Sequence, residues 1–182
     1  MENRRALLDA AKSLVAAKGV RATTTAEIAI KAGVAKGLLF YYFKDKESTI
    51  RAIAEELDAA YMASLLAKVE HKPALERLHA LINHHFNFLK NSPEDAQFLY
   101  QSMVVKQLPL GFYEHLYTHI LDILVLGLRS GEFVLQDPEE LAYMILGSLH
   151  GIGRLMLSEF KRDYDAAKHL AMFYDHVLLC QA

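Results

Sequence analysis

The sequence predicts an all-α fold, and three observations lead to that prediction. Apolar residues recur at helical spacing along almost the whole chain of 182 residues, and no segment keeps the period of two that marks a half-buried strand. Hydrophobic residues make up 53% of the chain, which is enough to bury a sizeable core between helices. All four prolines fall at expected helix starts or in loops. We therefore expect about nine helices and no strand.

The first two helices are delimited by glycine and threonine. Apolar residues between Leu7 and Val15 form one face of a helix, and Gly19 can adopt the left-handed conformation that ends it. Thr24 and Glu27 have the spacing of a capping box, in which each side chain satisfies a free backbone N–H of the other residue. The box predicts the start of a short second helix, which should end near Gly33.

A third helix is expected from about Ala35 to Phe43, and Asp45 can cap a fourth helix that begins at Lys46. The third helix contains four consecutive aromatic residues, Phe40 to Phe43, which so short a helix cannot bury together. Some of these rings must therefore be exposed. The residues that share one face and can pack on the first helix are Val34, Leu39 and Phe43.

Prolines, acidic residues and glycines mark the boundaries of the later helices. A helix expected over 112–129 ends at Ser130 and Gly131, and a last helix covers roughly 165–179. Three further helix starts are indicated by a proline, and acidic residues follow the second and third of them: Pro73, Pro93 and Pro138.

The second and third helices, joined by a tight turn at Gly33, have the lengths and the connection of a helix-turn-helix motif. A helix of eight residues is about 12 Å long, which is comparable to the width of the DNA major groove. Residues 1–50 hold nine Lys or Arg against five Asp or Glu, whereas the rest of the chain holds eleven against seventeen. A basic head on an acidic body indicates that the first 50 residues meet a polyanion.

The sequence from Ile28 to Glu47, IAIKAGVAKGLLFYYFKDKE, closely resembles the TetR family of bacterial transcriptional regulators. The flanks agree, because an amphipathic helix that ends in Lys-Gly is followed by Thr-Thr-Thr-Ala-Glu-Ile. The resemblance covers about residues 5–55 and implies a DNA-binding domain over residues 1–46, with the helix-turn-helix at about 24–43. It also implies that residues 47–182 form a helical domain for ligand binding and dimerisation.

In that family the third helix enters the major groove, while the second helix and the start of the fourth contact phosphates. The resemblance implies base-edge contacts by Lys36, Gly37 and Leu38, and phosphate contacts by Thr25, Tyr41, Tyr42 and Lys46. Leu38 and Phe40 depart from the family pattern, in which a small hydroxyl residue and a tyrosine are common, so readout at these two positions would use apolar contact. Packing inside the domain is the alternative role for Tyr41.

The resemblance also implies that the last two helices, expected over 138–160 and 165–179, pair with those of a second copy in a four-helix bundle. Glycine inside a helix costs about 1 kcal/mol relative to alanine, and close approach of two helices can justify that cost. A kink beside a ligand pocket is the alternative explanation for the glycines. The residues expected at the dimer interface are Gly147, Gly151, Ile152, Leu155, Phe173 and Val177.

The family binds small, often apolar or aromatic ligands among its middle helices, so the resemblance implies such a ligand here. No cationic cluster indicates the chemistry of the ligand, and ordinary core packing is the alternative role for the residues concerned. The aromatic and methionine side chains expected to line a pocket are Phe86, Phe88, Tyr100, Met103, Phe112, Tyr113 and Tyr117.

Two histidine pairs lie in the C-terminal region. His115 and His119 have the i, i+4 spacing with which a helix can hold a metal ion, but no third ligand is evident, so neither a metal nor a cofactor is expected. His84 and His85 are adjacent and point to different helix faces, so at most one is expected to face the interior, satisfied by a neighbour. The sequence holds no catalytic motif, and no enzyme activity is expected.

The longest stretch without Asp, Glu, Lys or Arg runs from Leu141 to Gly153, which is shorter than the ~20 apolar residues of a membrane-spanning helix. No secretory leader is recognisable, and the single cysteine, Cys180, excludes an internal disulfide. A soluble cytoplasmic protein without a membrane partner is therefore expected.

Together these features predict a sequence-specific DNA-binding regulator, most simply a repressor that binds a palindromic operator as a homodimer and is released by a small molecule. One alternative is a helical small-molecule carrier whose basic head docks a partner, and another is a helical enzyme that uses the histidine-rich body. Salt-sensitive affinity for double-stranded DNA distinguishes the regulator from the carrier. The enzyme would require an acid–base pair in a cleft, and the sequence offers only isolated histidines.

Overall fold

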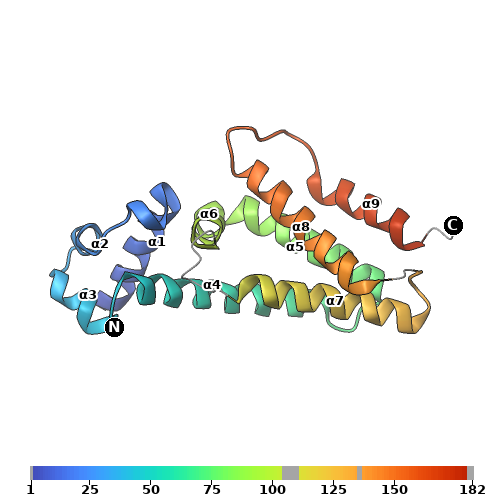
Figure 1. Ribbon diagram of the computed structural model, residues 1–182, viewed down its shortest axis with the longest axis horizontal. Helices are drawn as coiled ribbons and strands as arrows, with labels where there is room; N and C mark the ends of the chain where they lie inside the picture. Colours follow the sequence, from blue (N-terminus) through green and yellow to red (C-terminus); the bar gives the residue numbers. More distant parts are fainter. Residues whose placement is uncertain (1, 104–110, 135–136, 180–182) are drawn as a thin grey trace. The chain divides into compact units, whose positions relative to one another are not determined.

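The computed structural model describes residues 2–103, 111–134 and 137–179, and these form nine α-helices and no strand (Figure 1). The predicted all-α class is therefore confirmed. None of the helices in these ranges is both long enough and apolar enough to span a bilayer. In chain order the helices are α1 (Glu2–Ala22), α2 (Thr25–Ala32), α3 (Lys36–Tyr42), α4 (Lys46–Val69), α5 (Ala74–Asn91), α6 (Pro93–Met103), α7 (Phe112–Ser130), α8 (Pro138–Met156) and α9 (Ala166–Leu179).

The chain divides into two compact units. The first contains α1, α2, α3, α6 and the part of α4 up to Ala59, and the second contains the rest of α4 from Ala60 together with α5, α7, α8 and α9. The predicted boundary after residue 46 coincides with the start of α4, whereas the two units divide that helix near its middle. A single continuous helix therefore contributes residues to both units.

In the first unit, α1 packs against α2, α3 and α6. An ion pair of 2.5 Å between the Lys12 ammonium and the Asp95 carboxylate joins α1 to α6. Helix α6 thus belongs with the N-terminal helices, although it follows α5 in the sequence. The side chains completely removed from solvent in this core include Leu7, Val15, Ile28 and Leu39.

The predicted start and end of α2 agree with the structure, whereas α1 continues past its predicted end at Gly19 to Ala22. Gly19 has a φ of 81° and interrupts the regular geometry near the end of α1. Thr24 and Glu27 form the predicted capping box at the start of α2. Gly33 has a φ of 69°, a left-handed conformation that favours glycine, and it ends α2 where predicted.

In the second unit, α5 packs against α7, α8 and α9, and α7 packs against α8. Glu132, in the segment after α7, caps the N-terminus of α5, because its carboxylate accepts the backbone N–H groups of Ala74 at 2.8 Å and Leu75 at 3.0 Å. The predicted cap Asp137 accepts two backbone N–H groups at the start of α8. Helix α5 thus lies among its neighbours in this unit, with its first turn held by a residue far along the chain.

Candidate nucleic-acid interface

The N-terminus of α2 is held by a compact set of hydrogen bonds. The Thr24 hydroxyl accepts the Glu27 N–H at 3.3 Å, and the Glu27 carboxylate accepts the Thr24 N–H at 2.9 Å. The Lys18 ammonium bonds the same carboxylate at 2.5 Å, and the bonds from Lys18 and Thr24 lower the pKa of Glu27 to about 2. Thr25, an implied phosphate contact, is half-buried at the first position of this helix, where free N–H groups and the helix dipole favour an anion.

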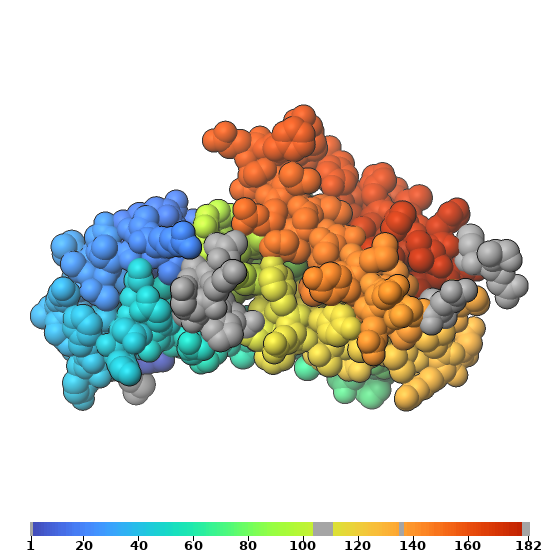
Figure 2. Space-filling model, viewed as in Figure 1, coloured from blue at the N-terminus to red at the C-terminus, as the bar shows by residue number. Residues whose placement is uncertain are grey.

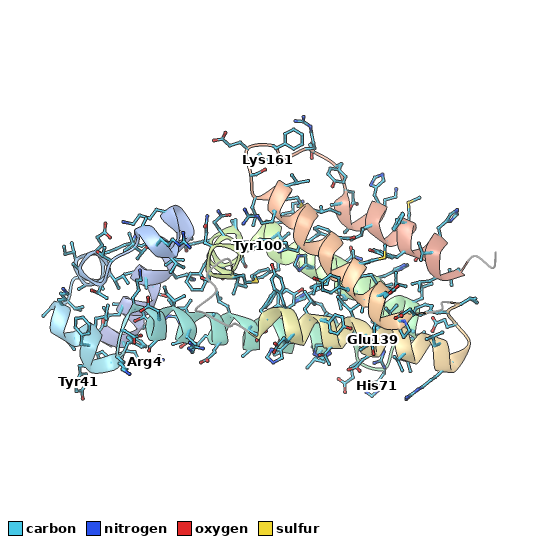
Figure 3. The ribbon with its side chains drawn as sticks, viewed as in Figure 1. Arg4, Tyr41, His71, Tyr100, Glu139 and Lys161 are labelled. Atoms are coloured by element: carbon cyan, nitrogen blue, oxygen red, sulfur yellow. The ribbon has the colours of Figure 1, made fainter. Side chains whose placement is uncertain are left out.

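The third helix presents two different faces. Leu39 and Phe43 are buried, as their spacing predicts, and Val34, expected on the same face, is half-buried. Phe40 is 49% exposed and Tyr41 is 79% exposed, and Figure 3 shows Tyr41 projecting away from the helix. The predicted exposure of part of the aromatic run is therefore confirmed.

The other residues for which the resemblance implies DNA contacts on α3 lie on the same short helix. Lys36 and Gly37 are exposed, and Leu38 and Tyr42 are half-buried. The Lys36 ammonium lies 5.9 Å from the centre of the Phe40 ring, and the rings of Tyr41 and Tyr42 meet edge to face at 5.1 Å. Cationic and aromatic groups side by side suit contact with phosphates and base edges. We call this set the α3 surface: Lys36, Gly37, Leu38, Phe40, Tyr41 and Tyr42.

Gly37 is not required by packing within its own chain. A Cβ built on Gly37 meets none of the described atoms within 4 Å. Glycine inside a helix nevertheless costs about 1 kcal/mol relative to alanine. Because no described neighbour requires a glycine here, Gly37 fits the role that the resemblance implies, which is to let its backbone approach a partner closely.

Lys46 has partners within the protein. Its ammonium donates hydrogen bonds of 2.9 Å to the backbone carbonyls of Val20 and Thr23. It is the first residue of α4, whose N-terminus is capped as predicted by the Asp45 carboxylate, which accepts the Ser48 N–H at 2.7 Å. The phosphate contact implied for Lys46 stays a prediction. Nothing in the sequence indicates its carbonyl partners, which lie 26 and 23 residues earlier.

Two arginines at the start of α1 also contact the elements around α3. The Arg4 guanidinium lies 5.4 Å from the centre of the Phe43 ring, and both Arg4 and Arg5 bond the Glu56 carboxylate on α4. These partners are 52 and 51 residues apart in the sequence, and no local pattern predicts such pairs. The arginines therefore hold α1 to α4 within the first unit.

The interior of the second unit holds a connected group of aromatic and histidine rings. The Tyr61 ring is central, with the ring centres of His84, Phe112 and Phe88 at 4.5, 5.0 and 5.3 Å. The rings come from α4, α5, α7 and α8. We call them the interior ring cluster: Tyr61, His84, His85, Phe86, Phe88, Phe112, Tyr113 and His150.

His84 and His85 are both buried, so the prediction that at most one faces the interior is wrong. The reason is that α5 packs against three helices and also contacts α4 through Tyr61, so more than one of its faces is covered. Each imidazole has a neighbour, as expected for a buried histidine. His84 Nε2 bonds the Tyr61 carbonyl at 3.1 Å, and the Tyr61 hydroxyl bonds His85 Nδ1 at 3.1 Å.

Burial favours the neutral form of both histidines. Desolvation lowers the pKa of His84, and the nearby charge of Lys68 lowers it further. The Lys68 ammonium lies 2.8 Å from His84 Nδ1 and can only donate, so Nδ1 accepts and Nε2 carries the hydrogen shared with the Tyr61 carbonyl. Desolvation lowers the pKa of His85 to about 3.

A second tyrosine–histidine pair lies in the same cluster. The Tyr113 hydroxyl on α7 bonds the His150 ring on α8 through Nδ1. Desolvation raises the pKa of Tyr113 to about 12. Desolvation also lowers the pKa of His150, and the charge of Arg154 adds to that effect. The pair is therefore an uncharged hydrogen-bonding unit at neutral pH.

The seven residues expected to line a pocket do not all lie in one unit. Phe86, Phe88, Phe112 and Tyr113 belong to the interior ring cluster, and Tyr117 is half-buried on α7 of the same unit. The other two are on α6 in the first unit, where Tyr100 is buried and Met103 is half-buried. The pocket assignment stays a prediction for all seven.

Helices α8 and α9 expose most of the residues expected at a dimer interface. Leu155 is 50% exposed and Phe173 is 55% exposed, while Ile152 is half-buried. A Cβ on Gly147 or Gly151 would meet none of the described atoms within 4 Å. Gly147, Gly151 and Val177 are exposed as well, and the two helices form the orange and red surface in Figure 2.

The histidines considered for metal binding lie on α7. His115 is exposed and His119 is half-buried. Across the part of the chain that the structure describes, no group of three His, Cys, Asp or Glu side chains is placed to hold a metal ion. Cys180 lies outside the described residues.

Known proteins resemble the chain both locally and along most of its length. Residues 7–53 match the family of bacterial regulatory proteins called the tetR family. The chain is 29% identical to the fatty acid metabolism regulator protein of Bacillus subtilis over 134 residues, which cover 69% of this chain and 68% of that protein. It is also 29% identical to the transcriptional repressor KstR2 of Rhodococcus jostii over 155 residues, which cover 77% of this chain and 72% of that protein.

A solved structure shares the fold. FadR from Bacillus subtilis, in complex with stearoyl-CoA, aligns with a TM-score of 0.82 and 23% identity over 96% of this chain and 97% of that chain. The residues 7–53 that match the family include all of α2 and α3, and therefore the whole α3 surface. Residues 7–53 belong to the tetR family of bacterial regulatory proteins, and the chain is a DNA-binding regulator of transcription.

Proposed function

We propose that this protein is a homodimeric repressor that reads a palindromic operator with the α3 surface and releases it when a small molecule binds. The observation that carries the proposal is the exposure of the α3 surface, where an accessible lysine and glycine accompany rings that are 49% and 79% exposed. Lys36, Gly37 and Leu38 face base edges, with an apolar contact from Phe40, and phosphate contacts come from Thr25, Tyr41 and Tyr42. The protein acts in the bacterial cytoplasm.

The dimer forms through α8 and α9. Support comes from the apolar side chains that these helices leave exposed, including Leu155 and Phe173, and from two glycines whose small size no described neighbour requires. The open space beside Gly147 and Gly151 favours a close helix contact with a second copy over a kink packed against the same chain. A two-fold axis predicts operator half-sites about one helical turn or more apart.

The ligand is small and largely apolar, and it binds in the second unit beside the interior ring cluster. The aromatic rings of that cluster and its two tyrosine–histidine pairs supply an apolar surface with uncharged hydrogen-bonding groups. Repression is supported by the relative KstR2, which is named a repressor. Stearoyl-CoA is the first compound to test, because FadR was solved with it and its acyl chain would supply the apolar group that the interior ring cluster suits.

Selection from a pool of random double-stranded DNA at about 150 mM salt tests the DNA-reading part of the proposal. We expect a palindromic sequence to be enriched. Lys36→Ala should weaken binding and relax the preference at one base position of each half-site, whereas Lys31→Ala, which removes an exposed lysine of α2, should leave the preference unchanged. Binding without any preferred sequence would contradict base reading, and no affinity even at low salt would favour the carrier.

The dimer and the ligand need separate tests. Phe173→Glu places a charge in the expected interface and should convert a dimer to a monomer in sedimentation velocity, while Tyr164→Glu on the exposed segment before α9 should not. Stearoyl-CoA added to the selected operator complex should release the DNA. Failure of a series of acyl-CoA chain lengths to bind or to release DNA would contradict this ligand class.

A further inference from the structure

The turn between α1 and α2 is tied to the start of α4 by one side chain. The Lys46 ammonium donates to the carbonyls of Val20 and Thr23, both at 2.9 Å, and is itself half-buried. Val20 belongs to the last turn of α1, and Thr23 immediately precedes the N-cap residue of α2. Lys46 therefore joins three elements of the first unit at one point.

Regular helical hydrogen bonding does not continue through this turn. Gly19, with φ 81° and ψ 166°, departs from helical geometry, and carbonyls near a helix C-terminus lack intrahelical partners. Thr23 is fully buried, and its hydroxyl donates to the Gly19 carbonyl at 2.9 Å. A cation at the end of α1 also meets the favourable end of the helix dipole. The Val20 carbonyl also accepts the Thr23 N–H at 3.3 Å, and Lys46 adds a charged donor to this carbonyl and to that of Thr23.

We propose that Lys46 is a positioning residue, which sets the place of the α2 N-terminus and acts on DNA through Thr25 rather than by touching a phosphate itself. An ammonium has three N–H donors, and two of them already bond carbonyls. Charge-assisted bonds of this kind are roughly twice as strong as neutral ones, so the two carbonyl bonds hold the ammonium at the turn, and only its third N–H is not used by them. The proposal rests on the proposed binding of DNA by α2 and α3. It assigns to Lys46 the positioning of the α2 N-terminus against the DNA backbone.

Amide exchange in the free protein tests the structural half of this proposal without DNA. Lys46→Met keeps the aliphatic stem and removes the ammonium. Exchange at Glu27 and Ile28, whose N–H groups bond Thr24, should become about tenfold faster. Exchange at Ser48 should not change, because Asp45 still caps α4. Lys44→Met, which removes a neighbouring exposed lysine, is the matched control and should alter none of these sites.

Operator affinity at several salt concentrations tests the functional half. Lys46→Met should weaken binding about tenfold, as expected for the loss of hydrogen bonds to a charged group. The slope of log affinity against log salt should stay unchanged, whereas a dimer that lost two phosphate contacts would lose about 1.8 from it. Thr25→Ala should cost less affinity in the Lys46→Met protein than in the wild type, because both changes act on the same contact.

The opposite set of results would overturn the proposal. A slope reduced by about 1.8, additive effects with Thr25→Ala and unchanged exchange at Glu27 and Ile28 would make Lys46 a direct phosphate ligand. If Lys46→Met does not fold, the same measurements are made on Lys46→Gln, which retains a neutral donor. A protein that binds no DNA would refute the proposed function, and unchanged exchange would still refute the positioning role on its own.

Discussion

The α3 surface and the interior ring cluster contain the same residue types in opposite environments. Tyr41 on α3 is 79% exposed, whereas Tyr61 in the second unit is 3% exposed. Helix α3 packs mainly against α1 and α2, while α5 is covered by α7, α8 and α9 and contacts α4 through Tyr61. Aromatic side chains therefore contribute to the core where several helices surround them, whereas on α3 two of them stay exposed to solvent.

The two units also differ in their histidine content. All nine histidines follow residue 50, and the first unit contains none of them. In the second unit, desolvation lowers the pKa values of His84, His85 and His150. Mild acid should therefore leave the stability of the first unit unchanged and lower that of the second unit, which holds the interior ring cluster.

The largest difference is expected from truncating one tyrosine in each unit. Tyr61→Ala empties the centre of the interior ring cluster and should lower the free energy of unfolding by about 3–5 kcal/mol. Tyr41→Ala should change stability by less than about 0.5 kcal/mol, yet weaken operator binding about tenfold. Urea unfolding and fluorescence anisotropy with labelled operator measure the two effects. A large stability loss from Tyr41→Ala would mean that its ring is part of the core.

Acid should separate the two units. An unfolded chain binds protons at histidine below pH 6.5, whereas folded His85 does so only near pH 3, so stability of the second unit falls as the pH drops between these values. The loss is up to about 1.4 kcal/mol per pH unit for each histidine kept neutral. Amide exchange, corrected for intrinsic rates, should speed up from pH 7 to 5 in α5 and α7 but not in α2. His85→Gln should reduce the dependence, and equal acceleration in both units would refute the assignment.

Two glycines offer a smaller, matched test. A Cβ on Gly127 would lie 2.0 Å from the buried Phe133 ring, so Gly127→Ala should destabilise the second unit by about 1–3 kcal/mol. A Cβ on Gly37 meets no described atom, so Gly37→Ala should stabilise α3 by up to about 1 kcal/mol and weaken operator binding. Thermal unfolding and anisotropy measure both variants. Unimpaired DNA binding by Gly37→Ala would argue against close backbone approach.

The smallest effects are expected at two helix starts. Thr24→Ala removes the local cap of α2, and Glu132→Ala removes the distant cap of α5, each at a cost of about 1 kcal/mol. Amide exchange should increase in the first turn of the affected helix alone. Exchange that rises throughout both units for either variant would show that the cap supports the whole fold rather than one helix end.

Several features of the fold could be predicted because they depend on neighbours in the sequence. Thr24 and Glu27 cap α2 across three residues, and Gly33 ends it with a left-handed conformation. The buried stripe of Leu39 and Phe43 follows from helical spacing alone. The exposed α3 surface was predictable as well, because a helix of seven residues has too little covered area for four consecutive rings.

Other features involve partners that no local pattern connects. Glu132 caps a helix that starts 58 residues earlier, and Lys46 bonds carbonyls that precede it by 26 and 23 residues. The burial of both His84 and His85 depends on which helices cover α5, and that is a property of the whole unit. The prediction that only one of them faces inward failed for this reason.

The sequence by itself determined the helical class, the start and end of α2 and the exposed aromatic face of α3, because each depends on hydrogen bonds and apolar spacing within about one or two helical turns. Only the tertiary structure decided that α6 packs with α1, that Tyr61 satisfies two histidines, and that Lys46 holds the turn before α2. Such pairings arise from loop closure and packing between distant segments, and side-chain identity leaves many of them equally possible until the helices are assembled.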